Sequence, residues 1–185
     1  VTPSPISTDA AERICRRFGI DQVRFTNSGT ESTMYAVRVA RSATGKRDIV
    51  KVEGGYHGSY DPFVVSSKPK LDAAGDADFP TAVVDENLVA GNVHVVPYNN
   101  PESLEQIFVK HASTIACFIV EPVLENIGIV LPDAGYLERV RELCDQYGIV
   151  LIFDEVKTGL TAGHQGAAQR LGVKPDLITL AKSIG

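Results

Sequence analysis

The stretch YGIVLIFDEVKTG, residues 147–159, decides the fold class of this chain. An unbroken apolar run at 149–153 has the length of a β-strand, and a helical apolar pattern ends just before it at Gly148. Apolar residues at successive positions, rather than at alternate ones, are typical of a strand that is buried on both faces of a sheet. Asp154 and Glu155 follow the run, so the sequence predicts a buried parallel strand with carboxylates at its carboxyl end.

The rest of the chain alternates helical and strand patterns around this run. Between 66 and 92 the alternation gives way to small and acidic residues, which predicts a long surface excursion. Apolar strands separated by helices predict an α/β fold, with a mainly parallel sheet and helices on both faces. Helices are expected at 8–18, 30–42, 102–110 and 137–147, and strands at 22–26, 48–52, 93–97, 113–120, 149–153 and 177–181.

Composition and charge exclude several classes of protein. The formal net charge is −5 and the basic residues are scattered, so we expect neither a nucleic-acid partner nor a membrane surface. No apolar run approaches the roughly 20 residues that span a bilayer. The histidines have no spacing that would complete a metal site, so no metal is expected.

The cysteines and the two ends of the chain bear on its compartment and its completeness. Cys15, Cys117 and Cys144 lie far apart in apolar surroundings, which favours buried structural thiols and fits a reducing compartment. We therefore expect a cytoplasmic protein, or one of an organelle such as a plastid. The chain starts at Val1 and stops at Gly185, and we expect it to be an internal fragment.

Ligands of parallel α/β sheets collect at the carboxyl ends of the strands, where helices begin. Ser28-Gly29-Thr30 opens a predicted helix, whose free N–H groups would favour a phosphate. Ser28 and Glu31 also have the spacing of a capping box, and both interpretations stay open.

A carboxylate and an aliphatic side chain share one wall after the strand at 149–153. Because side chains alternate along a strand, Asp154 and Val156 point to one face and Glu155 points to the other. The carboxylate could hold a ligand, ligate a metal or cap a helix.

Two further positions complete the candidate site. Tyr56 and His57 stand in the glycine-rich turn EGGYHG, either as turn residues or, for Tyr56, as a stacking surface for a flat ligand. Lys182 follows the apolar run 177–181, either as a surface amine or as a buried lysine whose lowered pKa makes it a nucleophile.

The candidate residues together offer a phosphate cradle, a carboxylate, an aromatic face, an aliphatic face and a lysine. This set matches pyridoxal 5′-phosphate (PLP), which needs a lysine for its aldehyde and a carboxylate for its pyridine nitrogen.

Five blocks of sequence, in order along the chain, resemble the class III aminotransferases of fold type I. The resemblance is strongest to the branch that contains glutamate-1-semialdehyde 2,1-aminomutase. It covers nearly the whole chain, and the blocks are FTNSGTEST, VKVEGGYHGSYD, CFIVEPV, YGIVLIFDEVKTG and KPDLITLAKSIG.

This resemblance implies a role for each candidate residue. Lys182 and Asp154 would be catalytic, the lysine as the Schiff-base residue and the carboxylate as the partner of the ring nitrogen. Glu121 would lie near the cofactor and the substrate, and we assign His57 to support of Tyr56. The cofactor-binding set implied is Ser28, Gly29 and Thr30 at the phosphate, Tyr56 and Val156 on the two faces of the ring, and His57, Glu121, Asp154 and Lys182 around it.

The resemblance also implies how the chain is organised. Residues 1–185 would be the central part of the PLP-binding large domain, without the small domain and the C-terminal part. The intact protein would be a homodimer with its active site at the subunit interface, acting on an amino acid or an amine. It would be a transaminase or an aminomutase; the alternatives are an ω-amino-acid or acetylornithine-type aminotransferase, and a non-catalytic PLP-binding fragment.

Two departures from the family pattern lie beside Asp154 and Val156, the residues that would face the cofactor. Lys157 stands where relatives more often have glutamine or methionine, and Leu160-Thr161 occurs in GLTAG, where a phenylalanine and an arginine are common. Because both departures would affect the substrate pocket, the resemblance does not identify the substrate.

Overall fold

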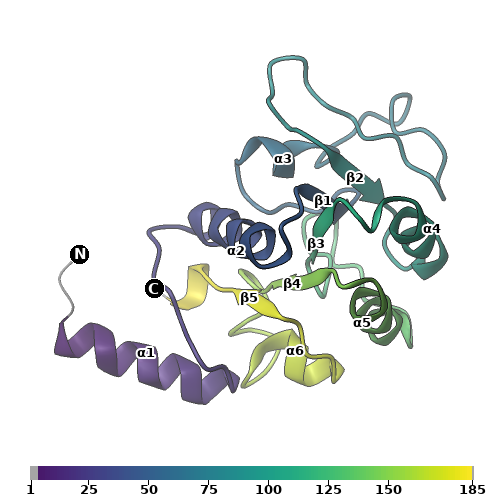
Figure 1. Cartoon of the computed structure of the whole chain (residues 1–185). Helices are drawn as coiled ribbons and strands as arrows, with labels where there is room; N and C mark the ends of the chain where they lie inside the picture. The colour runs from purple at the N-terminus through teal and green to yellow at the C-terminus, as the bar shows by residue number, and fades with distance from the viewer. Residues whose placement is uncertain (1–3, 185) are drawn as a thin grey trace.

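A computed structural model describes residues 4–184, and it contains a five-stranded parallel sheet (Figure 1). The strand order is β2-β1-β3-β4-β5, and every neighbouring pair is parallel. Residues 1–3 and Gly185, which closes the last of the family-like blocks, lie outside the described residues. The strands are β1 (Asp48–Val52), β2 (Val93–Val96), β3 (Ile115–Val120), β4 (Val150–Asp154) and β5 (Leu177–Thr179).

Helices cover both faces of this sheet, as the sequence predicts, with α2 on one side and α4 and α5 on the other (Figure 1). None of the helices in residues 4–184 is long and apolar enough to cross a membrane. The helices are α1 (Pro5–Phe18), α2 (Gly29–Thr44), α3 (Asp61–Val64), α4 (Pro101–His111), α5 (Tyr136–Tyr147), α6 (Gly166–Leu171) and the 3₁₀ turn η1 (Lys182–Ile184).

The continuous apolar strands supply one core on each face. Alternate residues of a strand point in opposite directions, so neighbours such as Cys117 and Phe118 enter different cores. Phe118 and Phe153 pack with residues of α4 and α5, whereas Cys117 and Ile152 pack with residues of α2. Burial on both faces explains why the strands carry no polar alternation.

Helix α2 is defined at both ends by its own sequence. The Ser28 hydroxyl accepts a hydrogen bond from the Glu31 N–H at 3.1 Å, and Gly45 ends the helix in the left-handed conformation. The expected capping box is incomplete, because the Glu31 carboxylate accepts from the Asn27 N–H at 2.7 Å rather than from Ser28. Helix α2 is thereby fixed with its N-terminus at the carboxyl edge of the sheet.

Two expectations about the first part of the chain are wrong. Residues 22–26 form no strand: the segment has no regular secondary structure, it pairs with none of the described strands, and Phe25 is exposed. Helix α1 begins one turn earlier than expected, at Pro5, because Ser4 is its N-cap.

The remaining differences concern short elements and one thiol. Helices α3 and α6 were not expected, because pieces this short show no helical period. Cys117 and Cys144 are buried and free as expected, but Cys15 is only half-buried. The excursion at 66–92 is confirmed, since it contains no named helix or strand.

We expect Phe118→Ala to lower the free energy of unfolding by about 3–5 kcal/mol, because this fully buried ring would leave a cavity between β3 and the helices above it. Phe25→Ala is the matched control: its ring is half exposed, and we expect a change of about 0.5 kcal/mol or less. Denaturant unfolding measures both values. Equal losses would contradict the core described here.

Candidate active site

A cleft of about 380 Å³ lies at the carboxyl edge of the sheet. Its size is in the range of small-molecule sites. The structure brings every predicted site residue to this one cleft, and adds some that the sequence did not indicate. The predicted residues are Ser28, Gly29, Thr30, Tyr56, His57, Glu121, Asp154, Val156 and Lys182. Lys157, which the resemblance placed beside the cofactor, also lines the cleft, and the residues not indicated are Asn27, Thr33, Gly58 and Ala181.

The N-terminus of α2 forms one wall of the cleft. A Cβ on Gly29 would lie 3.3 Å from the Ala181 Cβ and 3.4 Å from the Val156 methyl carbons, so α2 packs tightly against these two residues at this glycine. The first-turn N–H groups of an α-helix lack intrahelical acceptors and carry the positive end of the helix dipole. This wall therefore suits an anionic group such as a phosphate.

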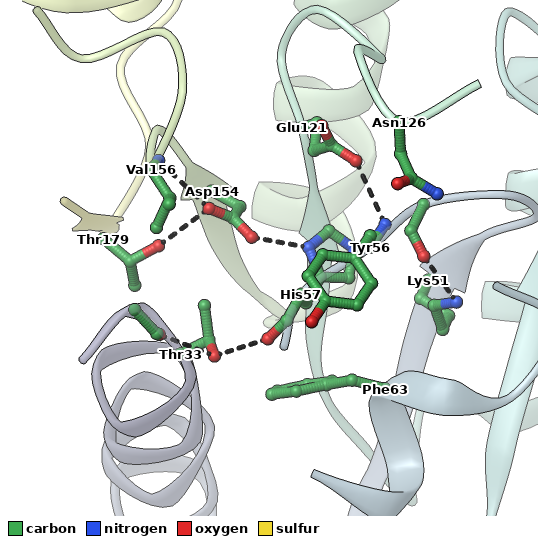
Figure 2. A network of polar contacts seen from close by, with 12 residues as sticks. Thr33, Lys51, Tyr56, His57, Phe63, Glu121, Asn126, Asp154, Val156 and Thr179 are labelled. Atoms are coloured by element: carbon green, nitrogen blue, oxygen red, sulfur yellow. Dashed lines mark hydrogen bonds and ion pairs between the residues drawn. The ribbon is translucent and has the colours of Figure 1, made fainter. Parts of the chain in front are cut away.

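A buried carboxylate, Asp154, lies in the cleft (Figure 2). Its Oδ1 accepts from the Val156 N–H at 3.1 Å and from the Thr179 hydroxyl at 3.3 Å, and its Oδ2 lies 2.8 Å from His57 Nδ1. An ionised carboxylate only accepts, so the imidazole donates at Nδ1. Three donors, from the turn after β4, the end of β5 and the loop that carries His57, fix the orientation of this carboxylate.

His57 supports Asp154 and not, as the sequence suggested, Tyr56. Its imidazole is buried against the edge of the Phe63 ring, and its backbone carbonyl accepts from the Thr33 hydroxyl of α2 at 2.7 Å. The side chain thus turns inward while Tyr56, the preceding residue, stays partly exposed (Figure 2). The distant partners, Asp154 and Thr33, explain why local sequence did not reveal this role.

Tyr56 is held by Glu121. The Tyr56 N–H donates to Glu121 Oε1 at 3.0 Å, and the Glu125 N–H donates to Oε2 at 3.3 Å. Burial raises the pKa of the Glu121 carboxyl, and the Tyr56 N–H, His57 and Lys157 oppose this shift. Lys157 Nζ lies 3.8 Å from Glu121 Oε2. The aromatic face of Tyr56 remains available to the cleft.

Lys182 lines the cleft, but it is exposed rather than buried. Strand β5 ends at Thr179, earlier than expected, so Lys182 lies past the strand in the 3₁₀ turn. Its φ of 52° is in the left-handed region, which is uncommon for a residue other than glycine. Of the two interpretations of Lys182, the structure therefore shows an exposed amine rather than a buried one, and this amine lies at the cleft.

Glu155 points away from the cleft, as the alternation along the strand predicts. Its carboxylate accepts from the backbone N–H groups of Ala167 and Ala168 at 2.6 and 3.0 Å, at the start of α6. The Thr158 hydroxyl donates to it at 3.0 Å. Glu155 therefore caps a helix, and Asp154 alone of the pair faces the ligand side.

Sequence reasoning missed Lys51, a side chain of β1 that holds the backbone of the loop carrying Tyr56. The lysine, which Figure 2 labels, is fully buried in β1. Its Nζ donates to Gly55 O at 2.9 Å and Val65 O at 2.6 Å, with Ser67 Oγ at 3.4 Å. Burial lowers the pKa of Lys51 to about 7, against the opposing charges of Glu121 and Glu53. A lysine inside the apolar run DIVKV was the signal that could have identified it.

The fold and the site together define a parallel α/β domain with a cleft of small-molecule size at the carboxyl edge of its sheet. The family model described as aminotransferase class-III matches residues 2–185. A glutamate-1-semialdehyde 2,1-aminomutase of Nitratidesulfovibrio vulgaris is 47% identical over 170 residues, which cover 90% of this chain and 39% of that protein.

Solved structures agree with this match. An omega-transaminase from Sphaerobacter thermophilus superimposes with a TM-score of 0.90 at 36% identity, over 97% of this chain and 42% of its own. A transaminase with PLP bound gives a TM-score of 0.84 at 38% identity, over 98% and 42%. The chain belongs to the class III aminotransferases, and it spans about two fifths of the length of these relatives.

Lys51 makes stability depend on pH. Between about pH 7 and about pH 8 the unfolded chain keeps this lysine protonated, with its ordinary pKa of 10.5, while the folded chain, with a pKa of about 7, goes from about half protonated to mostly deprotonated. The unfolded state then binds more protons, so we expect stability to rise with pH by about 1 kcal/mol per pH unit. Denaturant unfolding at several pH values measures this slope.

Lys51→Met should remove the slope, although it also lowers stability at every pH by leaving two carbonyls unpaired. Lys70→Met, at an exposed lysine, is the control and should keep the slope. A slope that survives in Lys51→Met would show that another group carries the pH dependence.

Proposed function

We propose that the full-length protein is a PLP-dependent enzyme that transfers an amino group, as a transaminase or as an aminomutase of the glutamate-1-semialdehyde type. Residues 1–185 would be the central part of its PLP-binding large domain. The observation that carries the proposal is the convergence, in one cleft, of a helix N-terminus, the buried carboxylate of Asp154 and the amine of Lys182.

The cleft fits a phosphorylated pyridine on its own chemistry. Ser28, Gly29 and Thr30 place the N-terminus of α2 at the cleft, where helix N–H groups suit a phosphate. Protein groups hold the Asp154 carboxylate in position, and the same side chain lines the cleft. In its ionised form this carboxylate would keep a proton on the ring nitrogen of the cofactor. When bound, PLP supplies an aldehyde and an electron-withdrawing ring that stabilises negative charge on a substrate carbon.

Each residue of the cleft would have its own role toward the cofactor or the substrate. Lys182 would bond to the aldehyde and, once displaced by the substrate amine, would act as general base and acid on the proton of the substrate carbon. Tyr56 and Val156 would pack on the ring. His57 keeps Asp154 in position, and Glu121 keeps Tyr56 in position.

A homodimer with the active site at the interface, an amino-acid or amine substrate and a cytoplasmic location belong to the same proposal. Exposed apolar side chains, one of which lies against the Tyr56 loop, support the dimer, because exposed apolar patches mark interaction surfaces. The free thiols support a reducing compartment. The exposed apolar residues are Ile127, Ile129 and Leu131, and Ile127 lies against Gly54 of the Tyr56 loop.

The match to the omega-transaminase structure favours a second candidate, an aminotransferase for ω-amino acids or amines. The two candidates differ in which amines react with the loaded enzyme. Binding of PLP by the full-length protein without turnover of any amine would instead indicate a non-catalytic binder.

Reduction with borohydride after incubation with PLP should attach the cofactor to Lys182 alone. Peptide mass spectrometry locates the adduct, and Lys182→Ala should abolish both the label and turnover. Lys68→Ala, at an exposed lysine outside the cleft, is the control and should label normally. Labelling that persists in Lys182→Ala would remove the basis of the proposed function.

Asp154→Asn should slow the reaction of the PLP-loaded enzyme with an amino donor by about 10²-fold or more, because the neutral amide no longer stabilises charge on the ring. Single-turnover absorbance changes measure this rate. The change keeps the side-chain size, and Asp72→Asn, at an exposed position, controls for loss of one negative charge. Equal rates in the two variants would contradict the role given to Asp154.

A further inference from the structure

The cleft contains one cationic side chain, Lys157, to which the proposed function gives no role. It lies in the turn after β4, next to Val156, and its backbone carbonyl accepts from the Thr161 hydroxyl at 2.7 Å. Its side chain lines the cleft and is 29% exposed. Within residues 4–184 its ammonium donates no hydrogen bond; its nearest anionic neighbour, Glu121, lies at 3.8 Å.

The two carboxylates of the cleft are already bound by other donors. Asp154 accepts from Val156 N, the Thr179 hydroxyl and His57. Glu121 accepts one backbone N–H on each oxygen. The distance to Glu121 gives Lys157 an electrostatic neighbour but no hydrogen bond, so its N–H donors are available to a ligand in the cleft.

We propose that Lys157 binds a carboxylate of the amino donor, which makes amino acids, rather than simple amines, the substrate class of this cleft. The inference rests on the proposed function, in which Lys182 and the α2 N-terminus are committed to the cofactor. A partly shielded ammonium binds a carboxylate through charge-assisted hydrogen bonds, which are stronger than those between neutral groups. A simple amine offers Lys157 no partner.

Two matched pairs of donors test this inference on the full-length, PLP-loaded protein. L-alanine is compared with isopropylamine, and 4-aminobutyrate with butylamine, because within each pair a methyl group replaces the carboxylate. Single-turnover absorbance changes over a range of donor concentration give kcat/KM and its division between kcat and KM. The variants are Lys157→Met, Lys157→Arg and, as a control for lost positive charge, the exposed Lys174→Met.

We expect the unmodified protein to prefer at least one amino acid over its matched amine. Lys157→Met should lower kcat/KM for that amino acid about tenfold, mainly through KM, and should leave the amine within about twofold. Lys157→Arg should retain most of the preference, since the guanidinium also binds carboxylates. Lys174→Met should change neither donor.

Several results would overturn the inference. Equal losses for both members of a pair would place Lys157 on the cofactor or in a structural pair with Glu121, and no loss would show that it is not used. A preference for amines, or reaction with none of the four donors, would also exclude a carboxylate-binding role. The borohydride label at Lys182 separates these results from failure of the proposed function, because that label does not depend on Lys157.

Discussion

The hydrogen bonds to the buried carboxylate of Asp154 are the constraint on which the cleft depends. They join three parts of the chain that are distant in sequence: the turn after β4, the end of β5 at Thr179, and the loop that carries His57. A buried charge without such partners would be costly. The polar network therefore fixes the relative positions of β4, β5 and the loop, and these are the elements that surround the ligand.

The loop that carries Tyr56 and His57 has a second set of supports beneath it. Lys51 holds the backbone carbonyl of Gly55 from inside β1, and Glu121 holds the N–H of Tyr56 from the end of β3. Both supports are buried polar side chains whose partners are mostly backbone groups. Backbone groups keep their place better than flexible side chains do, so the aromatic ring is presented to the cleft by a loop with little freedom.

The sequence alone predicts much of this molecule, and the failures have physical causes. Unbroken apolar runs identify the parallel strands, and the rule that ligands lie at strand carboxyl ends identifies the predicted cleft residues except Glu121, which the family resemblance supplied. The segment 22–26 has strand composition, but a strand also needs a hydrogen-bonded neighbour, which composition cannot show. The bonds from Thr33 to His57 and from Thr179 to Asp154 join residues distant in sequence, so no local pattern indicates them.

The parallel sheet has a consequence for the order in which the molecule folds. Each parallel pair of strands requires a long crossover connection, so pairing brings together residues that are far apart along the chain, and such contacts form slowly. The residues that line the cleft come from separate segments between Asn27 and Lys182, so every crossover connection lies between some of them. We expect the cleft to be complete only when β5 has joined the sheet. A ligand of this cleft would therefore bind the fully folded domain and not its folding intermediates.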